Sequence, residues 1–398
     1  MAIPFLDLKR QYEQLKDEIE PIAVEVMRSG AYIGGKYVAE FETNMKNYLG
    51  AKHVIPCANG TDALMIALRA CGVNPGDEVI TSPFTFFASA EAIAAIGAVP
   101  VFVDVKDSDF NIDVSKIEAA ITEKTKAIMP VHIFGWPCEM DAINEIAQKH
   151  GLKVVEDAAQ AIGSEYKGAK IGDSDNLVCF SFYPTKNLGA FGDAGMITTN
   201  DDDLAVIARA FCSHGMAKNG AIARELLSGV KDETAMESTG DSLYDPYKYY
   251  NYLIAYNSRL DAVQAAVLSL KLKYLDEYND ARQRVASLYN EGLHDVVQIP
   301  SPPELGKTCY HQYVIRTEKK DELCAFLSSR GIGTGAFYPV PLHLQKAFDY
   351  LGYKVGSLPI AEMICKQTVC LPIFPELTKS EINSVLQAIQ EFMVDSKA

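Results

Sequence analysis

The sequence predicts an α/β fold with two domains: a large one built around a mostly parallel, seven-stranded sheet, and a smaller α+β domain at the C-terminal end. From Lys52 onward, short apolar runs alternate with helix-like segments, which is the pattern of βαβ units. Apolar strands of this kind are typical of a parallel sheet that helices cover on both faces. The last part of the chain instead alternates strand, helix, strand and helix, and 398 residues are enough for two hydrophobic cores. We therefore predict domains over residues 1–269 and 270–398.

Two helices are predicted ahead of the sheet. Residues 6–28 carry apolar side chains at helical spacing, and Pro21 predicts a break or a second helix start within them. Residues 40–49 form the second predicted helix.

The predicted sheet follows from seven apolar runs and the segments between them. The strands are expected at 54–56, 78–82, 99–105, 127–133, 153–156, 178–182 and 196–199. Helices are expected at 61–70, 88–96, 114–121 and 140–150. No GxGxxG motif follows the first strands, which argues against a Rossmann oxidoreductase.

Residues 217–256 interrupt this pattern with polar and charged runs. They end in a cluster of tyrosines: Tyr244, Tyr247, Tyr249, Tyr250, Tyr252 and Tyr256. Loops of this length are usually functional or disordered, so the segment is either an insertion near an active-site mouth or a surface excursion. The elements predicted after it are a long connecting helix at 257–290, strands at 310–316 and 331–336, and helices at 321–330 and 379–393.

The composition limits the classes of function. A formal net charge of −15 argues against nonspecific binding to nucleic acid or to acidic membranes. Nine cysteines without a CxxC pair indicate reduced thiols, so neither a disulfide framework nor a metal site is expected. The N-terminus is charged where a signal peptide would be apolar, and no apolar run approaches membrane-spanning length. These features predict a cytoplasmic protein.

Lys186 is the first candidate catalytic residue. It lies in a turn with Gly189, Gly192 and Gly195, between two apolar strand-like runs. Desolvation lowers the pKa of a lysine, and the neutral amine is a nucleophile suited to Schiff-base formation with a carbonyl. The alternative is a surface lysine in an ordinary connection.

Two further features lie upstream of this lysine. Asp157 ends a predicted buried strand, at the sheet edge where α/β proteins bind ligands. A pyridoxal phosphate (PLP) enzyme needs an aspartate against the pyridine nitrogen, although Asp157 could instead cap a helix. Gly60 and Thr61 open a predicted helix whose free N–H groups suit a phosphate, or they belong to an ordinary cap. Together the three features match the aldehyde, ring nitrogen and phosphate of PLP.

The chain also resembles a known family in the order and spacing of six motifs. These are GTDAL (60–64), GDEVITSPFTFFAS (76–89), EDAAQA (156–161), SFYPTKNLGAFGDAG (181–195), NSRLDAVQAA (257–266) and YPVPLH (338–343). They are similar to those of the DegT/StrS family of nucleotide-sugar aminotransferases, which have the aspartate-aminotransferase fold. The resemblance covers nearly the whole chain.

The resemblance implies roles for individual residues around the cofactor. Phe86 is expected to stack on the pyridine ring, and Gln160 to lie beside the ring oxygen. Ser181 is expected to bind the phosphate together with Gly60 and Thr61. Trp136, in a loop after a strand, either lines the pocket or covers it.

Two more carried-over roles concern the subunits and the substrate. Asn257 is expected to reach the cofactor phosphate of a neighbouring subunit, unless it caps a helix, and Arg259 to approach the substrate. These roles imply a homodimer with shared active sites. By the same reasoning, the tyrosines of residues 217–256 are expected to contact the nucleotide or the partner.

The family resemblance also implies a reaction. Lys186 stands where some relatives carry a histidine and dehydrate sugars, so the lysine predicts amino transfer from L-glutamate to a keto-sugar nucleotide. The sequence GDAG at 192–195 favours a 3-keto substrate, linked to UDP or dTDP. Phe337 replaces a histidine of several relatives, and Tyr338 and His343 are the candidates to compensate as substrate contacts. The alternatives are a PLP-dependent sugar dehydratase, a transaminase acting on another ketone, and a catalytically silent PLP-binding regulator.

Overall fold

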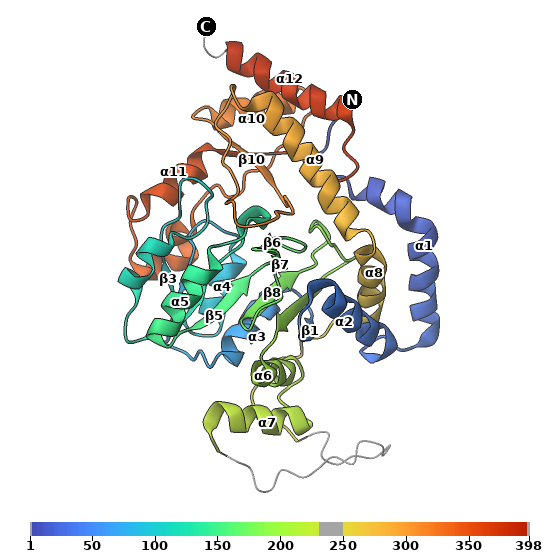
Figure 1. The fold of residues 1–398 in the computed structure, drawn as a ribbon, viewed down its shortest axis with the longest axis vertical. Helices are drawn as coiled ribbons and strands as arrows, with labels where there is room; N and C mark the ends of the chain where they lie inside the picture. Colours follow the sequence, from blue (N-terminus) through green and yellow to red (C-terminus); the bar gives the residue numbers. More distant parts are fainter. Residues whose placement is uncertain (1, 231–249, 396–398) are drawn as a thin grey trace.

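The fold is organised around one seven-stranded sheet, in a computed structural model that describes residues 2–230 and 250–395 (Figure 1). The strand order is β1-β9-β8-β5-β4-β2-β3. All strands run in the same direction except β9, which is antiparallel to both of its neighbours. The strands are β1 (His53–Cys57), β2 (Glu78–Thr81), β3 (Val99–Phe102), β4 (Thr125–Met129), β5 (Lys153–Asp157), β8 (Leu177–Ser181) and β9 (Gly195–Thr199). The predicted mostly parallel sheet is confirmed.

Helices cover both faces of the sheet because successive strand residues point to opposite sides. On β5, Val155 packs in one core cluster and Val154 in another. The first face is covered by α3 (Gly60–Ala70), α4 (Ala88–Ala95) and α6 (Asp202–Cys212). The second face is covered by α2 (Gly35–Leu49), α5 (Met140–His150) and α8 (Ala262–Leu272). A sheet buried on both faces explains the near-continuous apolar character of its strands.

The C-terminal part of the chain forms its own core at one end of the molecule, where both chain ends also lie (Figure 1). Its two strands, β10 and β11, pair antiparallel, and Ile3 from the N-terminus bridges to Ile332 beside them. The elements are α9 (Leu275–Leu293), β10 (Tyr313–Arg316), α10 (Lys320–Ser329), α11 (Pro359–Gln367), β11 (Thr368–Leu371) and α12 (Lys379–Asp395). The predicted boundary at 269–270 falls inside α8 and stays a prediction.

Four predicted elements differ in the structure. Pro21 does not break α1, which is continuous over Leu8–Ser29, because Pro21 lies on the exposed face while Leu15, Ile19 and Val26 are buried on the other. The helix predicted at 114–121 consists of two short 3₁₀ turns, η1 (Val114–Lys116) and η2 (Glu118–Ala120).

The predicted long helix at 257–290 is two helices, α8 and α9, that meet at Lys273 and Tyr274. The strand predicted at 331–336 contributes only single bridges, and β11 is the partner of β10 instead. Three glycines weaken the predicted segment as a strand, whereas Thr368–Leu371 is fully buried.

Part of the predicted insertion lies outside the described residues, including Tyr244, Tyr247 and Tyr249. Its first part forms α7 (Ala217–Ser228), which packs on α6 at the end of the molecule opposite β10 (Figure 1). Across residues 2–230 and 250–395, no helix has both the length and the apolar character needed to cross a membrane.

Candidate active site

A cavity of about 520 Å³ lies at the carboxyl edge of the sheet. Its walls come from the residues that end or follow β1, β2, β4, β5 and β8, and from segments of the C-terminal part. Parallel strands bring their carboxyl ends to one edge, and this is where α/β folds bind ligands.

Lys186 lies in this cavity, in the turn between β8 and β9. Its backbone N–H donates to the Tyr183 carbonyl at 2.8 Å. The turn is tight, because a Cβ at Gly189 would lie 2.3 Å from the Pro184 carbonyl oxygen. Burial lowers the pKa of Lys186 to about 8, although the charge of Asp157 acts in the opposite direction. The turn therefore presents an amine that is partly neutral near physiological pH.

Side chains from distant elements hold this turn in place. The Asn187 amide donates to Asn279 Oδ1 at 2.8 Å and to the Cys309 carbonyl at 2.9 Å. Lys271, which is buried on α8, donates to the Gly189 carbonyl at 2.5 Å. The position of Lys186 thus depends on α8, α9 and the segment before β10.

Asp157 is buried at the end of β5, and both of its carboxylate oxygens have partners. Ser89 donates its hydroxyl to Oδ2 at 2.7 Å, and the Ala159 N–H donates to Oδ1 at 3.1 Å. The alternative of a helix cap does not apply, because residues 158–176 contain turns and a short hairpin but no helix. The carboxylate is instead held as part of the cavity wall.

The N-terminus of α3 forms a second wall. Asn59 caps the helix by accepting from the Asp62 N–H at 2.8 Å. Because Gly60 has no side chain, the first turn of α3 can lie directly against Ser181. A Cβ at residue 60 would lie 2.7 Å from Ser181 Cβ. The Ser181 hydroxyl and the first helical N–H groups therefore face the same part of the cavity, and such N–H groups favour an anion.

Aromatic and amide groups complete the enclosure. Phe86 and Tyr183 line the cavity, although their side chains are 58% and 53% exposed. Gln160 accepts from the Phe134 N–H at 2.7 Å, and its amide nitrogen donates to Tyr338 Oη at 2.8 Å. Tyr338 is partly buried, and desolvation raises its pKa, so its hydroxyl stays neutral.

Most of the residues proposed from the sequence meet in this cavity. Those that line it are Gly60, Thr61, Phe86, Asp157, Gln160, Ser181, Lys186 and Tyr338.

Asn257 and Arg259 do not line it and are exposed. The buried Ser258 between them donates to Asp62 at 2.6 Å, so the segment lies against the start of α3. Asn257 is also not a helix cap, because Asp261 precedes α8.

His343 is likewise not part of the cavity. It is 2% exposed, its Nε2 lies 3.1 Å from Glu362 Oε1, and its ring packs beside Phe102 and Tyr353. The structure therefore gives His343 a packing position, which corrects its expected place as a substrate contact. Trp136 is also buried outside the cavity, against Phe134 and Phe110.

The sequence did not indicate several cavity residues. His311 and Gln312 line it immediately before β10, and Ser89 lines it beside Asp157. Their signal is weak because each is a common polar residue, far in sequence from Lys186, and only the folded chain brings them together.

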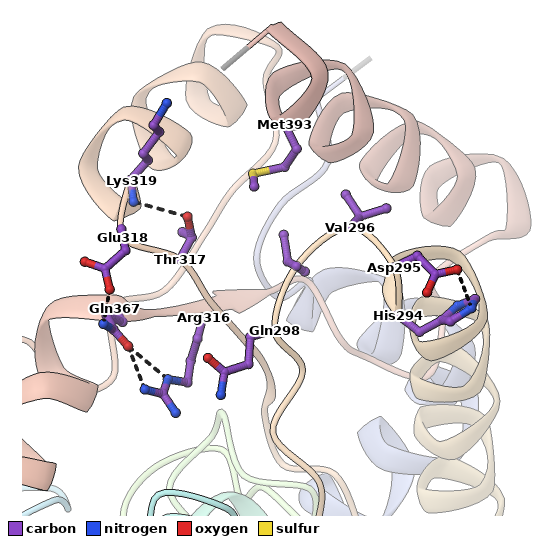
Figure 2. Close-up of a pocket in the computed structure, with 11 residues that line it drawn as sticks. His294, Asp295, Val296, Gln298, Arg316, Thr317, Glu318, Lys319, Gln367 and Met393 are labelled. Atoms are coloured by element: carbon purple, nitrogen blue, oxygen red, sulfur yellow. Dashed lines mark hydrogen bonds and ion pairs between the residues drawn. The ribbon is translucent and has the colours of Figure 1, made fainter. Parts of the chain in front are cut away.

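A second cavity, of about 490 Å³, lies in the C-terminal part (Figure 2). Arg316 is buried and forms an ion pair with Asp107 at 2.6 Å. Arg316 also bonds to Gln367, and His294 pairs with Asp295 (Figure 2). The Arg316 guanidinium is thus balanced by a protein carboxylate, and this ion pair joins Asp107 to β10.

Comparisons with known proteins agree with this geometry. A family model described as the DegT/DnrJ/EryC1/StrS aminotransferase family matches residues 13–390. A protein of Geobacillus stearothermophilus named "Pleiotropic regulatory protein" is 48% identical over 98% of this chain and 99% of its own. The UDP-N-acetyl-3-dehydro-alpha-D-glucosamine 3-aminotransferase of Acidithiobacillus ferrooxidans is 38% identical over 98% of this chain and 97% of its own.

A solved structure is also similar over nearly its full length. The crystal structure of DesV from S. venezuelae, in complex with a ketimine intermediate, has a TM-score of 0.89 and 38% identity, and covers 98% of both chains. The predicted family and fold class are confirmed by these matches. The chain belongs to the DegT/DnrJ/EryC1/StrS aminotransferase family.

Proposed function

We propose that the protein is a PLP-dependent aminotransferase that moves an amino group from L-glutamate to a 3-keto-sugar nucleotide linked to UDP or dTDP. The observation that carries this proposal is the single cavity that contains the Lys186 amine, the Asp157 carboxylate and the N-terminus of α3. The name of the Acidithiobacillus relative, which specifies a 3-dehydro sugar, supports the 3-keto substrate. The product would be an amino sugar for a surface polysaccharide or a glycosylated metabolite.

The residues of the cavity fit PLP at each of its functional groups. The N–H groups of Gly60 and Thr61 donate to no protein group in the described chain, and together with Ser181 they would hold the phosphate. Asp157 would keep a proton on the pyridine nitrogen, and Lys186 would bind the aldehyde. Phe86 would pack on the ring and Gln160 would lie beside the ring oxygen. When bound, PLP supplies an electron sink for the carbon that carries the amine.

Lys186 also has a role in proton transfer. Once its amine is free, Nζ is the base that takes the proton from the α-carbon of the amino donor. Its lowered pKa suits this task, because a catalytic base works best when its pKa is near the operating pH. In the reverse direction, with the sugar, the same amine returns a proton.

The defining experiment supplies the purified enzyme with L-glutamate and a panel of 3-keto and 4-keto nucleotide sugars and identifies products by mass. We expect amination of the 3-keto compounds with stoichiometric 2-oxoglutarate. Dehydrated products would favour the dehydratase alternative, and turnover only with other ketones would favour a different transaminase. Binding of PLP without any turnover would favour the regulator that the name of the Geobacillus relative suggests.

A pH prediction follows from Lys186. Only the neutral amine attacks an aldehyde, so the rate at which cofactor-free enzyme captures PLP should rise about tenfold per pH unit below its pKa of about 8 and level off above it. Stopped-flow absorbance checks this. A rate that keeps rising with the same slope to about pH 10, as for an ordinary lysine, would contradict the proposal.

We also propose a cytoplasmic homodimer in which each subunit completes the active site of the other. Asn257 and Arg259 are exposed beside the start of α3, and Phe86, Tyr183 and Phe191 are exposed aromatic residues near the same cavity. Asn257 and Arg259 do not line the cavity of their own chain, so we expect them to contact the cavity of the partner. The nine free cysteines agree with a reducing compartment.

Mixing two inactive variants tests this sharing. Lys186→Ala removes the amine, and Asn257→Asp would repel the cofactor phosphate of the partner. Dissociated and reassociated at equal amounts, the two should recover about one quarter of wild-type activity, because half of the dimers are mixed and each has one intact site. No recovery, with mixed dimers demonstrated by native mass spectrometry, would show that each site is complete within one chain.

A further inference from the structure

Two polar residues of the cavity have no role in the functions described so far. His311 and Gln312 line the cavity, and they are only 7% and 8% exposed. Polar side chains that are buried this deeply normally have hydrogen-bond partners. The bonds that these two residues make within the protein therefore show which of their polar atoms are still available to a ligand.

The tautomer of His311 follows from the orientation of the Asn187 amide. Asn187 Nδ2 donates to the Cys309 carbonyl, which can only accept, so Asn187 Oδ1 is the atom that faces His311 Nδ1 at 3.1 Å. An amide oxygen accepts, and therefore His311 Nδ1 carries the hydrogen. His311 Nε2 is then an acceptor. Burial, with added repulsion from Lys186 and Arg282, also keeps the pKa of His311 well below its ordinary value, so the ring stays neutral.

The neighbouring Gln312 only partly satisfies this acceptor. Gln312 Nε2 lies 3.4 Å from His311 Nε2, which is long for a hydrogen bond. Gln312 Oε1 is buried and has no hydrogen-bond partner within residues 2–230 and 250–395. Leaving an amide oxygen buried and unpaired is unfavourable, so the protein groups satisfy this pair incompletely.

The polarity of the site decides which ligand atom fits. The bare Nε2 of His311 would be repelled by the phosphate or ring oxygens of PLP, so its partner is a hydrogen-bond donor. Tyr338 has the opposite polarity, because its oxygen accepts from Gln160 and its own hydrogen remains to be donated. The cavity thus offers one fixed acceptor and one donor to the part of a ligand that lies beyond the cofactor groups.

We propose that His311 and Gln312 form a subsite that recognises one hydroxyl group of the sugar ring, with His311 Nε2 accepting its hydrogen and the Gln312 amide completing the contact. The proposal rests on the nucleotide-sugar aminotransferase function given above. It makes this pair specific for the sugar half of the reaction, so the half-reaction with glutamate does not depend on it.

The test compares a preferred keto-sugar nucleotide with analogues that each lack one ring hydroxyl. In the wild-type enzyme, loss of the recognised hydroxyl should leave the subsite groups unpaired and lower kcat/KM by about ten- to a hundredfold. With His311→Phe, kcat/KM for the parent substrate should fall by about the same factor. Removal of the same hydroxyl from the substrate should then lower kcat/KM of this variant almost no further. The rate of the single-turnover reaction with glutamate should stay within about threefold of wild type.

A second test variant and a control variant complete this experiment. Gln312→Leu keeps the bond between Asn187 and His311, so it should show a smaller, sugar-specific loss without disturbing the Lys186 turn. His294→Phe, in the other cavity, is the matched control and should behave as wild type with every analogue. Calorimetric titration of the amino-sugar product gives a readout independent of turnover, and His311→Phe should weaken its binding.

Distinct results would overturn distinct claims. The proposed subsite is wrong if no hydroxyl deletion lowers kcat/KM more in wild type than in His311→Phe. It is also wrong if the rate of the glutamate half-reaction falls in parallel. Neither result would contradict the aminotransferase function. If the wild-type enzyme aminates no nucleotide sugar, the proposed function fails and this inference fails with it.

Discussion

Lys186→Ala should abolish amino transfer and eliminate the absorption of the lysine-bound cofactor. The amine is both the attachment point of the aldehyde and the base that moves the substrate proton, so we expect kcat to fall by at least about 10⁴-fold. Lys186→Arg should be equally inactive, because guanidinium keeps the charge but does not act as a nucleophile near neutral pH. Absorbance spectra and a glutamate-coupled assay measure both effects.

A second lysine with a lowered pKa allows a more specific prediction. Burial also lowers the pKa of Lys271 to about 8, but Lys271 donates to the Gly189 carbonyl and does not line the cavity. A lowered pKa alone therefore does not select the reactive amine, and position in the cavity does. After borohydride reduction, peptide mapping should find the cofactor on Lys186 and none on Lys271. Transfer by Lys186→Ala, or label on Lys271, would be fatal to the assignment.

The fold of the large sheet was predictable because its strands are buried on both faces and therefore apolar along their whole length. Val154 and Val155 illustrate this, since they pack into different cores on the two sides of β5. The errors arose where that signal is missing. Pro21 predicts a break from local geometry alone, yet tertiary packing of the opposite face keeps α1 continuous.

The candidate site was predictable in the residues that carry distinctive chemistry in short motifs. Lys186, Asp157 and Gly60 are of this kind, since each stands in a motif that matches one functional group of the cofactor. His311, Asn187 and Lys271 are not, because their roles come from contacts between segments far apart in sequence. His343 shows the opposite error, in which a motif residue is used for packing against Glu362.

Asp157→Asn should reduce kcat/KM by about 10²- to 10⁴-fold, which corresponds to the roughly 3–5 kcal/mol lost when a buried charge pair loses one partner. The fold should tolerate the change. The amide oxygen can keep the Ala159 N–H bond, and the amide nitrogen then faces Ser89, whose hydroxyl can rotate to accept and to donate to Thr85 at 2.9 Å instead. The midpoint of thermal unfolding of the cofactor-free protein should therefore shift little.

Ser89→Ala is the matched control, because it removes one hydrogen bond but leaves the charge of Asp157. It should lower kcat/KM by about tenfold or less. If Asp157→Asn and Ser89→Ala lost activity equally, the negative charge would have no special role, and Asp157 would be an ordinary hydrogen-bonding residue at the end of β5.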